Sequence, residues 1–168
     1  SISAVSYGFG SKGKVDAKRD IFDPRWLQAG PIVKWNEGVF INTHETDKTR
    51  LTNFLNNAEE HNGIYIINNK IAFVPYGTFV TGVQSVGDFA RDPKTNGLAR
   101  GLEFSRGKTA PKLSEVGSEK HYKEGVDVFG WNPSEDPTQK VASLYSNRNI
   151  GDNRLRVIGY NWSDLDDG

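Results

Sequence analysis

The 168-residue chain contains no cysteine and no methionine. Without cysteine there is no disulfide framework, no thiolate zinc site and no cysteine nucleophile. The lack of methionine indicates a processed or excised chain, so we expect either a small complete protein or a portion of a longer one. Long apolar runs are also missing. No stretch approaches the ~18 residues of a membrane-spanning helix, and residues 1–10 lack the basic start and apolar core of a signal peptide.

An excess of charge of one sign is missing too, since Lys plus Arg and Asp plus Glu number 21 each. The overall charge therefore does not favour binding to nucleic acid, and nothing predicts insertion into a membrane. The length suits one domain with its own core. We expect an irregular N-terminal arm over residues 1–30 and one strand-rich domain over residues 31–168. The 18 glycines exceed the usual share and favour many short strands over a helical bundle.

The strongest pattern in the chain is that of an amphipathic helix. Its apolar residues recur at i, i+3, i+4 and i+7, which places them on one side of a helix: Leu51, Phe54, Leu55 and Ala58. We predict a helix over residues 46–62. Thr46 is the expected N-cap, because its hydroxyl can accept a hydrogen bond from a free backbone N–H of the first turn. Asn62-Gly63 can take the left-handed conformation that ends a helix.

Strand signals flank this helix on both sides. Runs of β-branched and aromatic residues predict strands within residues 31–35, 39–42, 64–67, 71–74, 78–80, 83–91, 102–104, 126–129, 141–145 and 155–160. Asn68-Asn69 predicts a turn, and residues 108–125 predict a long exposed loop. The expected fold class is mainly β with one short amphipathic helix. The alternative is an α+β domain in which the helix packs on an antiparallel sheet.

Part of this pattern resembles a known family. The residues concerned are Thr46-Asp47-Lys48-Thr49, Leu51, Phe54-Leu55, Ala58, Gly63 and Val74-Pro75-Tyr76-Gly77-Thr78-Phe79-Val80. This segment, residues 46–80, resembles the entry of right-handed parallel β-helix proteins of the bacteriophage tailspike and polysaccharide depolymerase type. In that family a short amphipathic helix covers the open end of the stacked strands. The resemblance implies the start of a right-handed β-helix with a capping helix at 46–62.

The resemblance also implies a function. It is that of a portion of a phage tailspike or tail-fibre-like virion protein, which forms a homotrimer, contacts other virion proteins and attaches to bacterial surface polysaccharide. The implied location is the virion or the extracellular space. If the protein is an enzyme, we expect a polysaccharide depolymerase, either a glycoside hydrolase or a lyase. Two other classes stay open: a stand-alone carbohydrate-active enzyme or carbohydrate-binding domain, and a structural interaction domain without a ligand.

Candidates for catalysis come from the carboxylates. Glycoside hydrolysis needs two carboxyl groups about 5 to 10 Å apart across the scissile bond. Glu103, Asp127 and Asp152 lie near predicted strands and are the candidates for such a pair. With 21 acidic residues in the chain, a solvated surface position is the commoner fate of any one of them.

Candidates for carbohydrate binding come from the aromatic residues. Trp131 stands beside Asn132-Pro133, and Tyr160 and Trp162 flank Asn161. Flat rings beside loop amides are typical of a sugar-stacking surface. The alternative is that these rings fill the core, which is the usual position of Trp and Tyr.

The remaining motifs predict no cofactor and no metal. The G-x-G-x-x-G pattern at residues 8–13 is not followed by a helical pattern, as a dinucleotide site requires. No second histidine follows His44 at i+4, so a zinc protease motif is excluded. We expect His44 and His61 at the surface and His121 in the long loop. Asp164–Asp167 lacks the spacing of a calcium loop.

Overall fold

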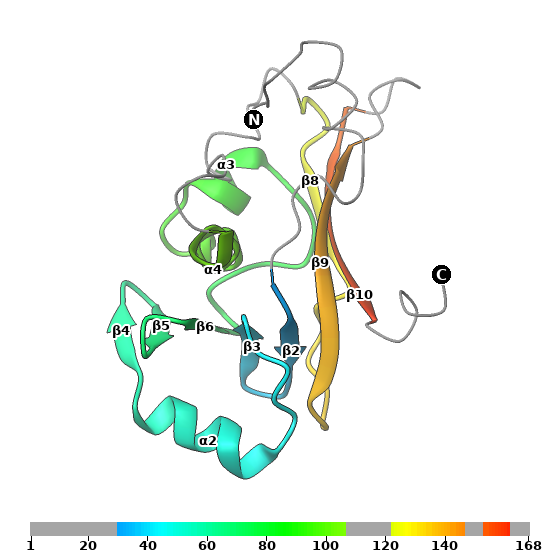
Figure 1. The fold of residues 1–168 in the computed structure, drawn as a ribbon. Helices are drawn as coiled ribbons and strands as arrows, with labels where there is room; N and C mark the ends of the chain where they lie inside the picture. The colour runs from blue at the N-terminus through cyan, green and yellow to red at the C-terminus, as the bar shows by residue number, and fades with distance from the viewer. Residues whose placement is uncertain (1–29, 107–121, 147–152, 162–168) are drawn as a thin grey trace, which may run out of the picture.

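The computed structural model describes residues 30–106, 122–146 and 153–161. These residues form one mixed nine-stranded sheet and three short helices, which confirms the prediction of a mainly β fold. The strands are β2 (Ile32–Lys34), β3 (Gly38–Ile41), β4 (Glu59–His61), β5 (Ile64–Ile67), β6 (Ile71–Pro75), β7 (Gly82–Gln84), β8 (Val126–Phe129), β9 (Thr138–Ser146) and β10 (Leu155–Asn161). The helices are α2 (Lys48–Asn56), α3 (Val86–Ala90) and α4 (Gly97–Arg106). The spatial order of the strands is β4-β5-β6-β3-β2-β9-β10-β8-β7 (Figure 1).

Most neighbouring strands in the sheet run antiparallel, and β8 and β10 form the parallel pair. Asn68 and Asn69 turn the β5–β6 hairpin with φ angles of 54° and 57°, and the Lys70 N–H donates to the Ile67 carbonyl at 3.0 Å. Positive φ at both central positions is the geometry that matches the twist of a hairpin. The predicted turn at Asn68-Asn69 is therefore confirmed.

The expected start of a right-handed β-helix is not confirmed. Successive coils of that fold stack their strands in parallel, whereas β5 and β6 pair antiparallel. The segment expected to form the first strand of that β-helix, residues 74–78, contains only the last two residues of β6, and just beyond it Phe79 makes an isolated bridge to Asn96. Helices packed on a largely antiparallel sheet correspond to the alternative architecture that the sequence left open.

Helix α2 begins and ends differently from the predicted helix over residues 46–62. Its N-cap is Asp47 and not Thr46, because the Asp47 carboxylate accepts hydrogen bonds from the N–H groups of Thr49 (2.9 Å) and Arg50 (3.1 Å). The helix ends at Asn56, since Glu59–His61 leave it to pair with β5 as an edge strand. All three residues of this edge strand are exposed, and its charges oppose pairing with another chain.

Each face of the sheet has its own apolar core, because side chains along a strand alternate between the faces. In β3, Val39 and Ile41 point to one face and Phe40 to the other. Helices α3 and α4 cover the first face, and α2 covers the second (Figure 1). The larger core includes Val74, Phe89, Leu98, Leu102, Trp131 and Val157, and the smaller one contains Val33, Phe40, Leu51, Ile67 and Phe73.

The strand predicted at residues 102–104 is wrong, because these residues belong to α4. Leu98 and Leu102 lie four residues apart and are both buried. Gly101 lets the helix approach the sheet closely, since a Cβ at this position would lie 2.6 Å from Val74 Cγ2 and 2.7 Å from Ile41 Cδ1. The glycine that suggested a strand boundary is therefore a point of close packing between helix and sheet.

The other strand predictions have mixed outcomes. Strands β2 and β3 confirm the hairpin expected within residues 31–42, and β8, β9 and β10 confirm the three strands expected near the C-terminus. The segment 83–91 contributes to β7 and then forms α3. Residues 1–29, including the glycine-rich motif, and residues 108–121 of the expected loop lie outside the described residues. Among the helices that are described, none is long and apolar enough to cross a membrane.

Candidate functional site

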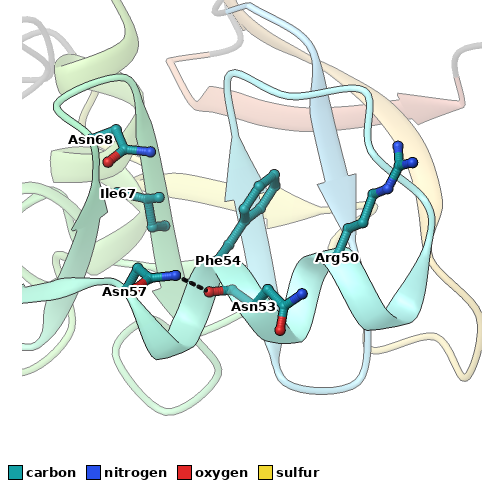
Figure 2. Close-up of a pocket in the computed structure, with 6 residues that line it drawn as sticks. All are labelled: Arg50, Asn53, Phe54, Asn57, Ile67 and Asn68. Carbon is teal, nitrogen blue, oxygen red and sulfur yellow. Dashed lines mark hydrogen bonds between the residues drawn. The ribbon is translucent and has the colours of Figure 1, made fainter.

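A groove of about 560 Å³ with polar and apolar lining lies between α2 and the β5–β6 turn. Its lining residues are Arg50, Asn53, Phe54, Asn57, Ile67 and Asn68 (Figure 2). Spacings of three and four residues place Arg50, Asn53 and Asn57 on one stripe of the helix. Asn68 comes from the β5–β6 turn and forms the opposite side. The groove thus joins two segments that are separate in the sequence.

The floor of the groove belongs to the smaller core. The Phe54 ring packs against Phe40, with 6.4 Å between the ring centroids and an interplanar angle of 58°. Ile67 is 1% exposed, whereas Phe54 is half-buried and keeps part of its ring accessible. Leu51, which is fully buried one turn earlier, anchors α2 on the sheet. The polar rim therefore stands on a packed apolar base.

Three side-chain amides supply the hydrogen-bonding groups of the rim. The Asn57 amide donates to the Asn53 backbone carbonyl at 3.0 Å, which fixes its orientation (Figure 2). The side-chain amides of Asn53 and Asn68 make no hydrogen bond with another described residue. Each amide offers one acceptor oxygen and two donor hydrogens. The rim can therefore donate to and accept from the same ligand.

Arg50 places a positive charge at one end of the groove. One nitrogen of its guanidinium lies 3.5 Å from the carboxylate of Glu45, and the Arg50 side chain is 71% exposed. An ion pair as open to solvent as this contributes little free energy, about 0 to 1 kcal/mol. The guanidinium has five N–H donors in all, so a ligand oxygen can compete for it.

A smaller pocket of about 160 Å³ continues from the groove. It shares Asn57 and Asn68 with the groove and adds Glu59, Ile66 and Asn69. Asn68 and Asn69 have positive φ angles, and this turn conformation sets the direction of their Cα–Cβ bonds. The two pockets together offer a continuous strip of amides between Arg50 and Glu59, suited to an elongated ligand.

Trp131, which the sequence placed on a sugar-stacking surface, is a core residue. Its ring is fully buried, and its indole N–H donates to the Val157 carbonyl at 3.1 Å. The ring packs over Gly159, where a Cβ would lie 3.1 Å from two ring atoms. Since a stacking ring must be accessible, this prediction is corrected in favour of the core alternative.

The other two predicted stacking residues do not join Trp131. Tyr160 is half-buried on β10 and pairs in register with Val141 on β9. Trp162 lies outside the described residues. Tyr160 precedes the exposed Asn161, whose side chain accepts a hydrogen bond from Lys140 at 2.8 Å. Of the three predicted stacking residues, the structure therefore describes Trp131 in the core and Tyr160 half-buried on β10.

The candidate carboxylates come from different elements. Glu103 is half-buried on α4, the helix that packs on β3 and β6. Asp127 is half-buried on β8, beside Arg156 of β10 and Val83 of β7 in register. Asp152 lies outside the described residues. Neither Glu103 nor Asp127 lines the groove along α2 or its continuation.

The histidines have surface positions where they are described. His61 lies on the exposed strand β4, with its Nε2 3.5 Å from the carboxylate of Glu59. His44 is exposed, and its carbonyl accepts a hydrogen bond from the Gln139 amide at 3.0 Å. His121 lies outside the described residues. Within residues 30–106, 122–146 and 153–161, no group of three His, Asp or Glu side chains could hold a metal ion.

Sequence reasoning missed the residues that line the groove. Helical spacing places Arg50, Asn53 and Asn57 on the polar side of α2, but a polar side is also the ordinary composition of a solvated helix face. Asn68 was assigned to a turn. Both α2 and the β5–β6 turn are rich in asparagine, and this is the sequence signal that could have connected the two segments. That their side-chain amides line the same groove follows only from the fold.

Comparison of the chain with protein-family models, with curated proteins and with solved structures gives no match.

Proposed function

We propose that this protein binds bacterial surface polysaccharide through the groove along α2, as a portion of a phage tailspike or tail-fibre-like virion protein. The observation that carries the binding proposal is the lining of the groove. It combines the amides of Asn53, Asn57 and Asn68 and the guanidinium of Arg50 with the partly accessible Phe54 ring. The continuation of the groove past Asn57 supports a chain-like ligand over a compact one.

The chemistry of a sugar chain fits these groups. Each sugar hydroxyl is both a donor and an acceptor, and a side-chain amide offers both functions in one plane. The C–H face of a sugar ring is apolar and can rest on an aromatic side chain, so Phe54 supplies the apolar part of the contact. Asn68 and Asn57 lie where the two pockets meet, and there they can contact successive units of the chain.

The lining supports binding more than catalysis. Hydrolysis of a glycosidic bond requires a proton donor and a second carboxylate on the other side of the bond. Amides and guanidinium groups do not change protonation state near neutral pH and so do not act as general acid or base. Among the described residues, no carboxylate lines the main groove. We therefore assign recognition of the polysaccharide to this groove. Any depolymerase activity is assigned to another part of the virion protein.

The virion setting and the homotrimer rest on the sequence resemblance of residues 46–80. The antiparallel pairing of β5 and β6 does not support the β-helix part of that resemblance. The proposal of polysaccharide binding therefore does not depend on a β-helix fold. The oligomeric state can be measured by light scattering after size-exclusion chromatography. A trimer agrees with the tailspike setting. A monomer at micromolar concentration overturns the trimer and leaves the groove to be judged by its own test.

The test of binding is a comparison of two double variants on a panel of capsular and O-antigen polysaccharide fragments. Asn53→Ala/Asn68→Gly removes two amides of the groove while glycine keeps the positive φ of the turn. The loss of two hydrogen bonds of about 0.5–1.5 kcal/mol each predicts roughly fivefold or greater weakening.

The matched control is Thr52→Ala/Asn62→Gly, which changes the same helix and the neighbouring turn at positions that do not line the groove. We expect the control to bind as the wild type does. Equal binding by both double variants, or binding to no fragment on the panel, contradicts the proposal. Calorimetric titration of the tightest fragment gives the affinities.

A further inference from the structure

We propose that a second site, on the other flank of α2, binds an organic ammonium group. The site is an open pocket of about 330 Å³, a size at the lower end of small-molecule sites. Its lining residues are Glu37, Leu55, Tyr65, Phe73 and Pro75. None of them lines the groove described above, so this proposal does not rest on polysaccharide binding.

The pocket presents an aromatic surface that the core holds in place. Phe73 is 4% exposed, and its ring centroid lies 4.5 Å from that of Phe40 and 6.2 Å from that of Tyr65. Tyr65 is half-buried and is therefore the ring with accessible area. Leu55 of α2 and Pro75 of β6 add apolar walls. A ligand with an apolar body can be covered on several sides here.

Two acidic residues neighbour Tyr65, one in the lining of the pocket and one in register on β4. Glu37, in the turn between β2 and β3, lines the pocket and is exposed. Glu60 lies directly opposite Tyr65 in the β4–β5 register, and partners in register share one face of a sheet. Neither carboxylate has an ion pair or a side-chain hydrogen bond with another described residue. No protein cation among these residues neutralises either group.

An aromatic ring and a carboxylate together select a cation that carries carbon. A cation within about 6 Å of a ring is attracted by the negative face of the ring. Glu37 adds Coulomb attraction, and Leu55 and Pro75 favour apolar substituents on or beside the nitrogen. Hydrated metal ions lack such substituents. The shared chemistry of the ligand is therefore an organic ammonium.

Two sources can supply this chemistry, namely the free amine of an amino sugar and a quaternary ammonium headgroup. The experiment uses the full chain labelled with ¹⁵N, titrated with glucosamine and with choline. Each has an uncharged match: N-acetylglucosamine for the first, and dimethylbutanol, in which carbon replaces the quaternary nitrogen, for the second. We expect one or both cations to shift the amide signals of Tyr65 and Glu37 with millimolar affinity, about 4 kcal/mol of binding free energy.

The variants separate charge from ring. Glu37→Gln should weaken binding of the cation about fivefold, as expected for loss of one exposed charge contact. Tyr65→Leu should weaken it by a similar factor, whereas Tyr65→Phe, which keeps the ring, should retain it. Glu124→Gln removes an exposed charge just before β8, outside the pocket, and should have no effect.

The outcomes decide the proposal and its source. Binding of glucosamine alone identifies an amino sugar, and binding of choline alone identifies a quaternary ammonium. The proposal is overturned if the uncharged matches bind as tightly as the cations, or if neither cation shifts Tyr65. It is also overturned if Glu37→Gln binds as the wild type does. The groove variants Asn53→Ala/Asn68→Gly should leave this binding unchanged, so failure here is distinguishable from failure of polysaccharide binding.

Discussion

The guanidinium of Arg100 on α4 donates to the carbonyl of Asn62 in the β4–β5 turn at 2.5 Å. The same side chain donates to the His61 carbonyl at 3.1 Å and to the Asn96 side chain at 3.1 Å. It thus connects the helix on one face of the sheet to the edge hairpin. Because β4 has only three residues, all exposed, we expect this connection to help hold the edge of the sheet.

Replacement of Arg100 tests that connection. Hydrogen bonds from a charged donor are worth more than neutral ones, but these are partly exposed, so we expect Arg100→Ala to cost about 1–2 kcal/mol of unfolding free energy in urea. Amide hydrogen exchange of β4 should accelerate more than that of β9. Lys94→Ala, at an exposed position of the preceding loop, is the control and should change stability by less than about 0.5 kcal/mol. Unchanged exchange in β4 would contradict the assignment.

Tyr76 and Trp131 form a second long-range connection. The Tyr76 hydroxyl donates to the Trp131 carbonyl at 2.7 Å, and burial raises the pKa of Tyr76 above its ordinary value of 10.0. The Tyr76 hydroxyl therefore ionises at a lower pH in the unfolded chain than in the folded one. Its contribution to the free energy of unfolding is complete below about pH 10 and is lost as the pH rises above that value. Above about pH 10 the free energy of unfolding should therefore fall less steeply with pH in Tyr76→Phe than in the wild type. Parallel curves for the two proteins would refute this.

Substitution of Gly101 and of Gly38 by alanine tests how closely other residues pack against these two positions. Gly101→Ala gains about 1 kcal/mol of helix propensity. The new Cβ, however, would meet Val74 and Ile41, and overpacking of this kind costs about 1–3 kcal/mol, so we expect net destabilisation. Gly38→Ala should cost more, because its Cβ would meet the backbone carbonyl of Val74, which cannot retreat as a side chain can. Thermal unfolding gives the order, and a stabilised Gly101→Ala would contradict it.

Local chemistry explains what the sequence predicted well. Asn68-Asn69 specifies its own turn, since asparagine tolerates positive φ, and the neighbouring strands need only their β-branched runs. The hairpin of β2 and β3 is local in the same sense. These elements depend on residues a few positions apart, and a pattern read along the chain contains that information.

Non-local contacts explain the errors. The sequence predicts a strand at Leu102, but Leu102 belongs to a helix whose Gly101 packs against Val74 of β6. These two residues are far apart in the sequence, and the fold brings them together. Trp131 was assigned to the surface because Asn132-Pro133 follows it. Its indole N–H finds the Val157 carbonyl on a strand that comes later in the chain. In each case the decisive partner lies on another element, where no local pattern records it.

The candidate site shows the same division. The polar stripe of Arg50, Asn53 and Asn57 follows from helical spacing. That this stripe faces Asn68 depends on where β5 and β6 fold back against α2. An exposed polar helix face is common, so the sequence offered no reason to single out this one. The groove becomes visible only when both segments are in place.

The sequence and the structure identify different N-cap residues for α2. Thr46 was the expected N-cap, but the Asp47 carboxylate accepts the bonds from Thr49 and Arg50. Removal of a capping side chain typically costs about 1 kcal/mol, so Asp47→Ala should lower the unfolding free energy by that amount. Thr46→Ala should change it by less than about 0.5 kcal/mol. Urea denaturation of both variants decides between the two caps. A larger loss of unfolding free energy in Thr46→Ala than in Asp47→Ala would show that Thr46 is the N-cap. Because α2 forms one side of the groove, Asp47→Ala should also weaken polysaccharide binding slightly.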